Sequence, residues 1–213
     1  MVRLNVPSFQ KDVIYIFQFA GNSRVSSTSP FCIKVEAFCR LHNLKFERRD
    51  TTSSRGSNGL LPFIELNGQQ TADSEFILKR LTEHFHLENF PDDRTEGIGF
   101  ALERMIENHT RHLLRLDMSR TVDVIARDFM VDNNFPSFVV PIGASIGGWM
   151  LMRQFRRAGT AAIGRFTAAE YGEMLRNDLL QLQNVLGDKQ FLKSDWPTTR
   201  CPKRGEIINS ISN

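Results

Sequence analysis

The stretch Ser29-Pro30-Phe31-Cys32 has the outline of a two-cysteine redox motif, Cys-Pro-aromatic-Cys, with serine in place of the first cysteine. In such a motif the first cysteine supplies the attacking thiolate. Because serine cannot do so, Cys32 has no partner for dithiol exchange, and the stretch excludes a disulfide oxidoreductase. Two alternatives remain: a serine hydroxyl that acts on a bound ligand, or a plain helix start with Ser29 as N-cap and Pro30 at the first helical position.

For the other residues that could do chemistry, two cysteines and two histidines, we expect structural roles. Cys39 follows Cys32 by seven positions, so on one helix their Cα atoms lie ~10 Å apart, too far for a disulfide. We expect both thiols in a core. His109 and His112 are one helical turn apart and could ligate a metal ion, but the sequence offers no third ligand. We therefore expect no metal site, and we expect His109 to be a hydrogen-bonded core residue.

Charge and cysteine usage narrow the class of protein. The 213 residues carry a net charge of only +3 with no dense run of Lys and Arg, which argues against a nucleic-acid partner. Three cysteines and an N-terminus without an apolar leader favour a reducing compartment, and we expect a cytoplasmic protein.

The most apolar stretch is 138–152. Its 15 residues are fewer than the ~20 that a membrane helix needs, so we expect no transmembrane segment. A buried helix is the leading prediction, with a membrane-surface role as the minority alternative. Gly143 and Gly147 within it predict one close helix crossing.

The elements that must position Ser29 form a compact α/β domain over 12–87. A β-branched and aromatic run predicts a strand over Val13–Phe19, and a helix begins at Ser29. A second strand, a Ser/Gly-rich loop, a hairpin around Asn67-Gly68 and a helix capped by Asp73 or Ser74 complete the order β-α-β-loop-β-β-α. An N-terminal segment, 1–11, precedes this domain.

The second half is all helix, over 93–199. Apolar residues at three- and four-residue spacings predict one long helix through Ile98 and Leu116, and two further helices over about 120–130 and 140–156. A fourth begins with the capping box Thr167-Ala-Ala-Glu170 and stops at Gly187. Its predicted core stripe consists of Leu175, Leu179, Leu182 and Leu186.

Several stretches, in this order, resemble a known family. They are Gln18-Phe19, "SPFCIKVEAFCR" (29–40), "LPFIELNG" (61–68), "SEFILKRL" (74–81), "IGRFTAAEY" (163–171) and "LGDKQFL" (186–192). They resemble the glutathione-transferase-like proteins of the failed axon connections type, with their metaxin-like and cadmium-responsive relatives. The resemblance implies an α/β thioredoxin-like N-terminal domain followed by an all-α glutathione-transferase-like C-terminal domain.

The resemblance also implies a glutathione site. Ser29 would donate a hydrogen bond that stabilises the glutathione thiolate. Pro62 would be the family's cis-proline, with the backbone of Leu61 pairing with the cysteinyl part of glutathione. Asp73 and Ser74 would hold the γ-glutamyl end at a helix N-terminus.

Two departures from the family pattern weaken the case for catalysis. About nine residues, "GNSRVSSTS", separate the first strand from the helix, which is longer than the turn of ordinary transferases. After Thr199 the sequence diverges, so we expect a truncated helical domain, as in a truncated isoform, with a loose tail over 200–213. A missing helical layer would leave apolar helix faces exposed.

Two classes of function follow. The leading one is a non-catalytic or weakly active binding module that engages a protein partner or a membrane-associated complex, with a homodimer as a further possibility. The alternative is a glutathione-dependent transferase in detoxification or the metal-stress response, with Ser29, Leu61, Pro62, Asp73 and Ser74 as its site. Fold analogy alone cannot supply an activity.

Overall fold

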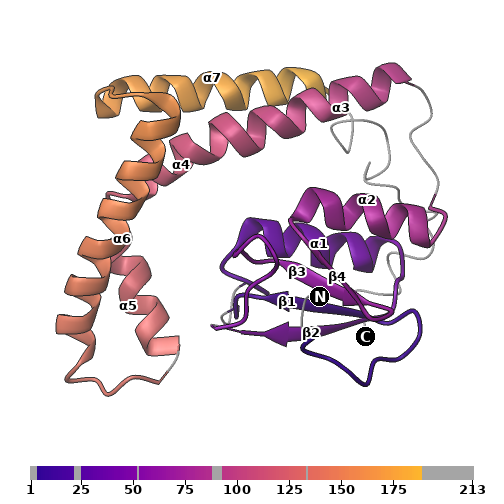
Figure 1. Cartoon of the computed structure of the whole chain (residues 1–213). Coiled ribbons are helices and arrows are strands. Elements are labelled where there is room, and N and C mark those ends of the chain that lie inside the picture. The colour runs from indigo at the N-terminus through magenta and orange to yellow at the C-terminus, as the bar shows by residue number, and fades with distance from the viewer. Residues whose placement is uncertain (1–3, 22–24, 52, 88–92, 133, 189–213) are drawn as a thin grey trace. The chain divides into compact units, whose positions relative to one another are not determined.

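The computed structural model describes residues 4–21, 25–51, 53–87, 93–132 and 134–188. Its contacts divide the chain into two compact units, and in sequence the first division falls after residue 90 (Figure 1). The described part of unit 1 is 4–87 and that of unit 2 is 93–188. Each unit is described by itself.

Unit 1 is a four-stranded sheet with two helices on one face (Figure 1). The strand order is β2-β1-β3-β4, with β1 and β2 parallel and the other neighbours antiparallel. The predicted order of elements is confirmed. The bounds are β1 Ile14–Gln18, α1 Pro30–Leu41, β2 Phe46–Asp50, β3 Phe63–Leu66, β4 Gln69–Ala72 and α2 Ser74–His84.

Alternate residues of the strands build two cores, one on each face. The helix-covered face carries Ile16 and Ile64 against Val35 of α1 and Leu81 of α2. The other face carries Tyr15, Phe17 and Phe63, with the rings of Phe17 and Phe63 stacked at 4.5 Å. On α1, Cys32, Val35 and Cys39 are fully buried. The hairpin is confirmed, because Asn67 and Gly68 both have positive φ angles, as a type I′ turn requires.

The N-terminal segment covers the second face of the sheet. The described residues between β2 and β3 form a loop and no helix. Val6 packs against the Tyr15 core. The buried carboxylate of Glu65 accepts hydrogen bonds from the backbone N–H groups of Asn5 and Val6 at 2.8 and 2.9 Å. The segment that the sequence sets apart as 1–11 therefore lies, over its described part, against the sheet.

Unit 2 is helical, and its first helix differs from the prediction. The expected long helix is interrupted by one π-helical turn at Ile106–Thr110. Thr110 of this turn is buried and contacts the last helix through Asp178. The capping box of Thr167 and Glu170 is confirmed. The bounds are α3 Asp93–Met105, η1 Ile106–Thr110, α4 Arg111–Met118, α5 Val122–Asp132, α6 Val140–Ile163 and α7 Ala168–Leu186.

Small residues bring the helices of unit 2 together. An added Cβ at Gly143 would lie 2.4 Å from the Met130 side chain of α5, so a close crossing is confirmed at this predicted glycine. At the other predicted glycine, Gly147, an added Cβ would make only an ordinary contact of 3.8 Å with Ala126, and the tighter approach is at Gly148, 3.1 Å from the backbone of Asp123. At Gly159 an added Cβ would meet Leu116 of α4 at 2.4 Å. A side chain at Gly148 would meet the backbone of Asp123, whereas side chains at Gly143 and Gly159 would meet the side chains of Met130 and Leu116.

Two burial predictions for unit 2 are wrong. The 138–152 stretch is not a buried helix: its small residues Ala144 and Gly148 are buried, whereas large ones such as Ile142 are exposed. In the predicted α7 stripe, Leu179 is exposed, the other three leucines are half-buried, and the buried residue of the helix is Asp178. The physical reason is the same in both helices, because the face turned toward the neighbouring helix carries small or hydrogen-bonding residues. None of the described helices combines the length and apolar character needed to cross a bilayer.

Candidate functional site

The register of the sheet gathers most of the predicted site residues at one end. Phe17, Phe63 and Ala72 pair in one row across β1, β3 and β4. Pro62 immediately precedes this row and Asp73 immediately follows it. Neighbouring strands lie ~4.8 Å apart. The segments Leu61-Pro62 and Asp73-Ser74, which adjoin this row, therefore lie close together at the same end of the sheet.

The segment before α1 returns to this same end. Ser27 is buried, and its hydroxyl donates to the carbonyl of Phe19 at 2.8 Å, while Thr28 N–H donates to the carbonyl of Ala20 at 3.3 Å. Ser29 occupies the N-cap position of α1 with extended backbone, but its hydroxyl makes no capping hydrogen bond. The N-cap reading of Ser29 is therefore right in position and wrong in bonding. Within the described residues its hydroxyl remains available to a ligand.

Leu61 has the backbone geometry that an extended ligand could use. The Leu61–Pro62 peptide bond is cis, as predicted. The Leu61 side chain packs with Cys32 and Phe63 in the second core. Among the described residues, neither the N–H nor the carbonyl of Leu61 takes part in a hydrogen bond. Unpaired backbone groups beside a strand end are the groups that pair with an added peptide strand.

Asp73 and Ser74 form the start of α2. Asp73 has φ of 75°, and its carboxylate accepts from the Glu75 N–H at 2.9 Å, so the capping role predicted for it is confirmed. Ser74 is buried as the first residue of α2. Within the described chain its hydroxyl makes no hydrogen bond. Free amides at a helix N-terminus attract a carboxylate.

Sequence reasoning missed a buried polar pair beneath this end of the sheet. Gln18 is fully buried, and its Nε2 lies 3.4 Å from both the Ser26 carbonyl and Oε2 of Glu36. Glu36 is itself buried and bound to the exposed Arg40 at 2.8 Å. In the part of the chain that the structure describes, Oε1 of Gln18 has no hydrogen-bond partner. One feature of the sequence could have indicated the burial of Glu36, because its position lies between Cys32 and Cys39 on the apolar face of the helix.

The two cysteines do not contribute to this site as nucleophiles. Cys32 and Cys39 are free and buried. Burial, reinforced by the negative charge of Glu36, raises the pKa of Cys39 to about 12. A thiol with such a pKa is protonated at neutral pH and is a poor nucleophile. The expectation that both are core residues is confirmed.

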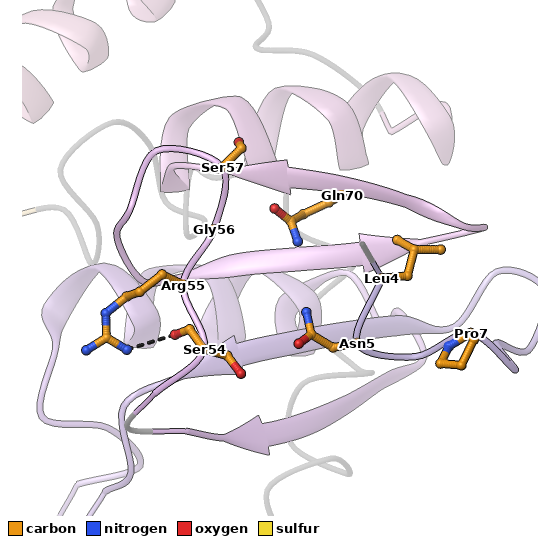
Figure 2. A pocket seen from close by; sticks show the side chains of 8 residues that line it. All are labelled: Leu4, Asn5, Pro7, Ser54, Arg55, Gly56, Ser57 and Gln70. Atoms are coloured by element: carbon orange, nitrogen blue, oxygen red, sulfur yellow. Dashed lines mark hydrogen bonds between the residues drawn. The ribbon is translucent and has the colours of Figure 1, made fainter. Parts of the chain in front are cut away.

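A separate open groove of about 990 Å³ lies on the second face of unit 1. Figure 2 shows it between the N-terminal segment and the loop before β3, with the side chains of Asn5 and Gln70 directed into it. Oε1 of Gln70 is buried there and has no partner among the described residues. None of the predicted site residues lines this groove. It is therefore distinct from the sheet-end site.

Unit 2 contributes one buried polar cluster. Asp178 of α7 accepts from the Thr110 hydroxyl at 2.5 Å and lies 2.8 Å from Nδ1 of His109. His109 is hydrogen-bonded, as predicted, but 41% of its side chain is exposed, so it is not a core residue. Burial, with the positive charges of Arg111 and Arg115, lowers the pKa of His112. Across the described residues no group of three potential ligands could hold a metal ion.

Comparison with known proteins identifies relatives of the chain. A model of the glutathione S-transferase N-terminal domain matches residues 30–123. The chain is 31% identical over 205 residues to failed axon connections of Drosophila melanogaster, a match that covers 90% of this chain and 48% of that protein. The chain is a relative of failed axon connections and carries a match to the glutathione S-transferase N-terminal domain. It spans about half the length of that relative.

Solved structures agree on the fold. A β-etherase from a Sphingobium strain superimposes with a TM-score of 0.57 at 13% identity, covering 94% of this chain and 82% of that one. A glutathione S-transferase of Ceriporiopsis subvermispora, solved in complex with glutathione, gives 0.53 at 16% identity over 86% of this chain and 79% of that one. The chain therefore has the thioredoxin-like and helical units of glutathione transferases.

Proposed function

We propose that unit 1 binds glutathione at the sheet end formed by Ser29, Leu61, Pro62, Asp73 and Ser74. The observation that carries this proposal is that two sets of polar groups at one end of the sheet make no hydrogen bond within the described chain. The backbone of Leu61 makes no hydrogen bond among the described residues, and neither does the hydroxyl of Ser74. A tripeptide with an extended backbone and a terminal carboxylate is complementary to both. The Ceriporiopsis structure in complex with glutathione supports this choice of ligand.

We propose further that the protein is a binding module with weak or no transferase activity. Pro30 at the start of α1 removes one amide that could otherwise stabilise a thiolate. The buried thiol of Cys39 is protonated and cannot replace a missing nucleophile. Such a module would act within a cytoplasmic protein complex or a membrane-associated complex, and the free, buried cysteines suit a reducing compartment.

The transferase reading stays as the second candidate because of Ser29. Its hydroxyl is not used as a cap, and a hydroxyl at this position can donate to a bound thiolate. Under this reading the protein would act on electrophiles in detoxification or stress. Turnover of a chromogenic electrophile that falls at least tenfold in Ser29→Ala, with unchanged glutathione affinity, would favour the transferase over the module.

Calorimetric titration with glutathione tests the binding proposal. We expect saturable binding by the full chain that Ser74→Ala weakens about tenfold, because a hydrogen bond to a charged group is lost. The matched control is Ser57→Ala, an exposed serine of the separate groove, which should bind as the native chain does. Absence of heat from a sample whose folding is verified by circular dichroism would refute the proposal. Equal loss in both variants would also refute it.

A further inference from the structure

Helix α6 carries several large apolar side chains on the side away from its neighbours. The buried residues of α6 are Val140, Ala144, Gly148 and Gly159, and three of these four are small. Three large apolar residues of the helix, Leu151, Met152 and Phe155, are half-buried. Four others, and one residue two positions before the helix, are 55% to 79% exposed. They are Phe138, Ile142, Ile146, Trp149 and Met150. This is the reverse of an ordinary surface helix, whose large apolar residues face the core.

These residues form one continuous face with three arginines. Ile142, Ile146, Trp149, Met150, Arg153 and Arg157 recur at three- and four-residue spacings, which places them on one side of a helix. Arg156 follows Trp149 by two turns and flanks the same face. We call these seven residues, together with Phe138, the α6 stripe. The Arg153 guanidinium lies over the Trp149 ring at 5.6 Å, so the apolar and basic halves of the stripe adjoin.

The charge of the stripe indicates what covers it. Helix α6 contains Arg153, Arg156 and Arg157 and no Asp or Glu. The neighbouring helix α5 does contain acidic residues, but it packs on another side of α6, where Gly148 meets the backbone of Asp123. A protein core would not complement three adjacent arginines. A surface of anionic headgroups above acyl chains complements both halves, with Trp and Phe at the interface and Arg beside the phosphates.

We propose that the α6 stripe docks unit 2 on an anionic membrane surface, with α6 lying in the plane of the interface. Ile142, Ile146, Trp149 and Met150 insert among the upper acyl chains, and the three arginines pair with lipid phosphates. The proposal concerns unit 2 and does not depend on glutathione binding by unit 1. It assigns the stripe to lipid and not to a second copy of the chain.

Vesicle co-sedimentation of the full chain tests the proposal. We expect binding to phosphatidylcholine vesicles that contain phosphatidylserine, weak binding to phosphatidylcholine alone, and a loss of binding as salt rises. Replacing Arg153, Arg156 and Arg157 by Gln should reduce the partition coefficient roughly fivefold for each charge removed. Ile146→Ser with Trp149→Ser should reduce it at least tenfold. The matched control is Leu60→Ser with Phe76→Ser, two equally exposed apolar residues of unit 1, which should bind as the native chain does.

A tryptophan reporter adds a readout of depth. The chain has two tryptophans, so Trp196→Phe leaves Trp149 alone, and its emission should shift to the blue and be quenched by brominated lipid. All stripe variants replace exposed side chains, and their circular dichroism spectra should match that of the native chain. Three results would overturn the proposal: no binding to anionic vesicles, equal loss in the unit 1 control, or dissociation of a lipid-free dimer by the stripe variant. The last result would assign the stripe to a second copy.

Discussion

The backbone N–H of Asn5 lies 2.8 Å from Oε1 of Glu65, sixty positions later in the chain. The Asn5 side-chain amide donates to the same oxygen at 2.9 Å, and the Val6 N–H donates to Oε2 at 2.9 Å. Glu65 is buried in the middle of β3. A buried carboxylate is stable only where donors surround it, so the N-terminal segment and this strand position depend on each other.

Glu65→Ala should therefore destabilise unit 1 by about 3 kcal/mol, because it leaves several N–H donors without their charged acceptor. Native-state hydrogen exchange of peptides from β1 and β3 measures the loss locally, without interference from unit 2. Glu47→Ala is the control: Glu47 is 42% exposed in its ion pair with Arg49, and its loss should cost less than about 0.5 kcal/mol. Similar protection in both variants would contradict the role assigned to Glu65.

Gly56 fixes the loop before β3 against the sheet end. A Cβ at this position would lie 2.8 Å from Cβ of Ala72 and 2.9 Å from Cβ of Phe63. Because neither atom can rotate away, Gly56→Ala should destabilise unit 1 by about 1–3 kcal/mol. Gly172→Ala in α7 meets nothing within 4 Å and should stabilise its helix by up to about 1 kcal/mol. Hydrogen exchange should report opposite signs for the two variants, and a neutral Gly56→Ala would show that the loop is not held there.

The local elements were predictable because each depends on neighbouring residues. A β-branched and aromatic run predicted β1, Asn67-Gly68 predicted the hairpin, and Thr167 with Glu170 predicted the start of α7. The burial of Glu65 and Gln18 was not predictable, since each depends on a partner far along the chain. A lone charged residue in an apolar strand gives no sign of which N–H groups it will meet.

The order of the site residues was predictable, but their bonding was not. Ser29 lies at the N-cap position, as predicted, yet its hydroxyl makes no capping hydrogen bond. The large residues of α6 suggested burial by hydrophobicity alone, and the error arose because composition does not say which side of a helix faces its neighbours. The paired glycines predicted the crossing itself, because only small residues allow two backbones to approach closely.

Asp178 connects the π-helical turn to α7 and offers a test of that connection. Removing it leaves the buried Thr110 hydroxyl and His109 Nδ1 without their shared acceptor. Asp178→Ala should destabilise unit 2 by about 1–3 kcal/mol, measured by hydrogen exchange of peptides from η1 and α7. The control is the adjacent, exposed Asn177→Ala, which should change stability by less than about 0.5 kcal/mol. Equal protection of η1 in both variants would rule out a structural role for this contact.

His112 should make the stability of unit 2 depend on pH. Burial, together with the charges of Arg111 and Arg115, lowers its pKa below the ordinary 6.5. Arg111 lies 3.1 Å from Nε2 of His112, so the neutral ring is the form that accepts its hydrogen bond. The unfolded chain binds a proton at about pH 6.5, whereas the folded chain does so only at lower pH, so protonation favours unfolding. The contribution of His112 is therefore complete above about pH 6.5 and is lost as the pH falls through the lowered pKa.

Urea unfolding of unit 2 on both sides of pH 6.5, followed through the emission of Trp149 in a Trp196→Phe background, measures this dependence. His112→Gln should flatten the slope by at most about one proton, because glutamine does not titrate. His86→Gln, an exposed histidine of unit 1, should leave the slope unchanged. If His112→Gln keeps the native slope, the acid sensitivity of unit 2 belongs to its carboxylates, and the environment of His112 in the folded chain does not disfavour the charged ring. If the slope reverses, the folded chain stabilises imidazolium, and Arg111 cannot be donating to this ring.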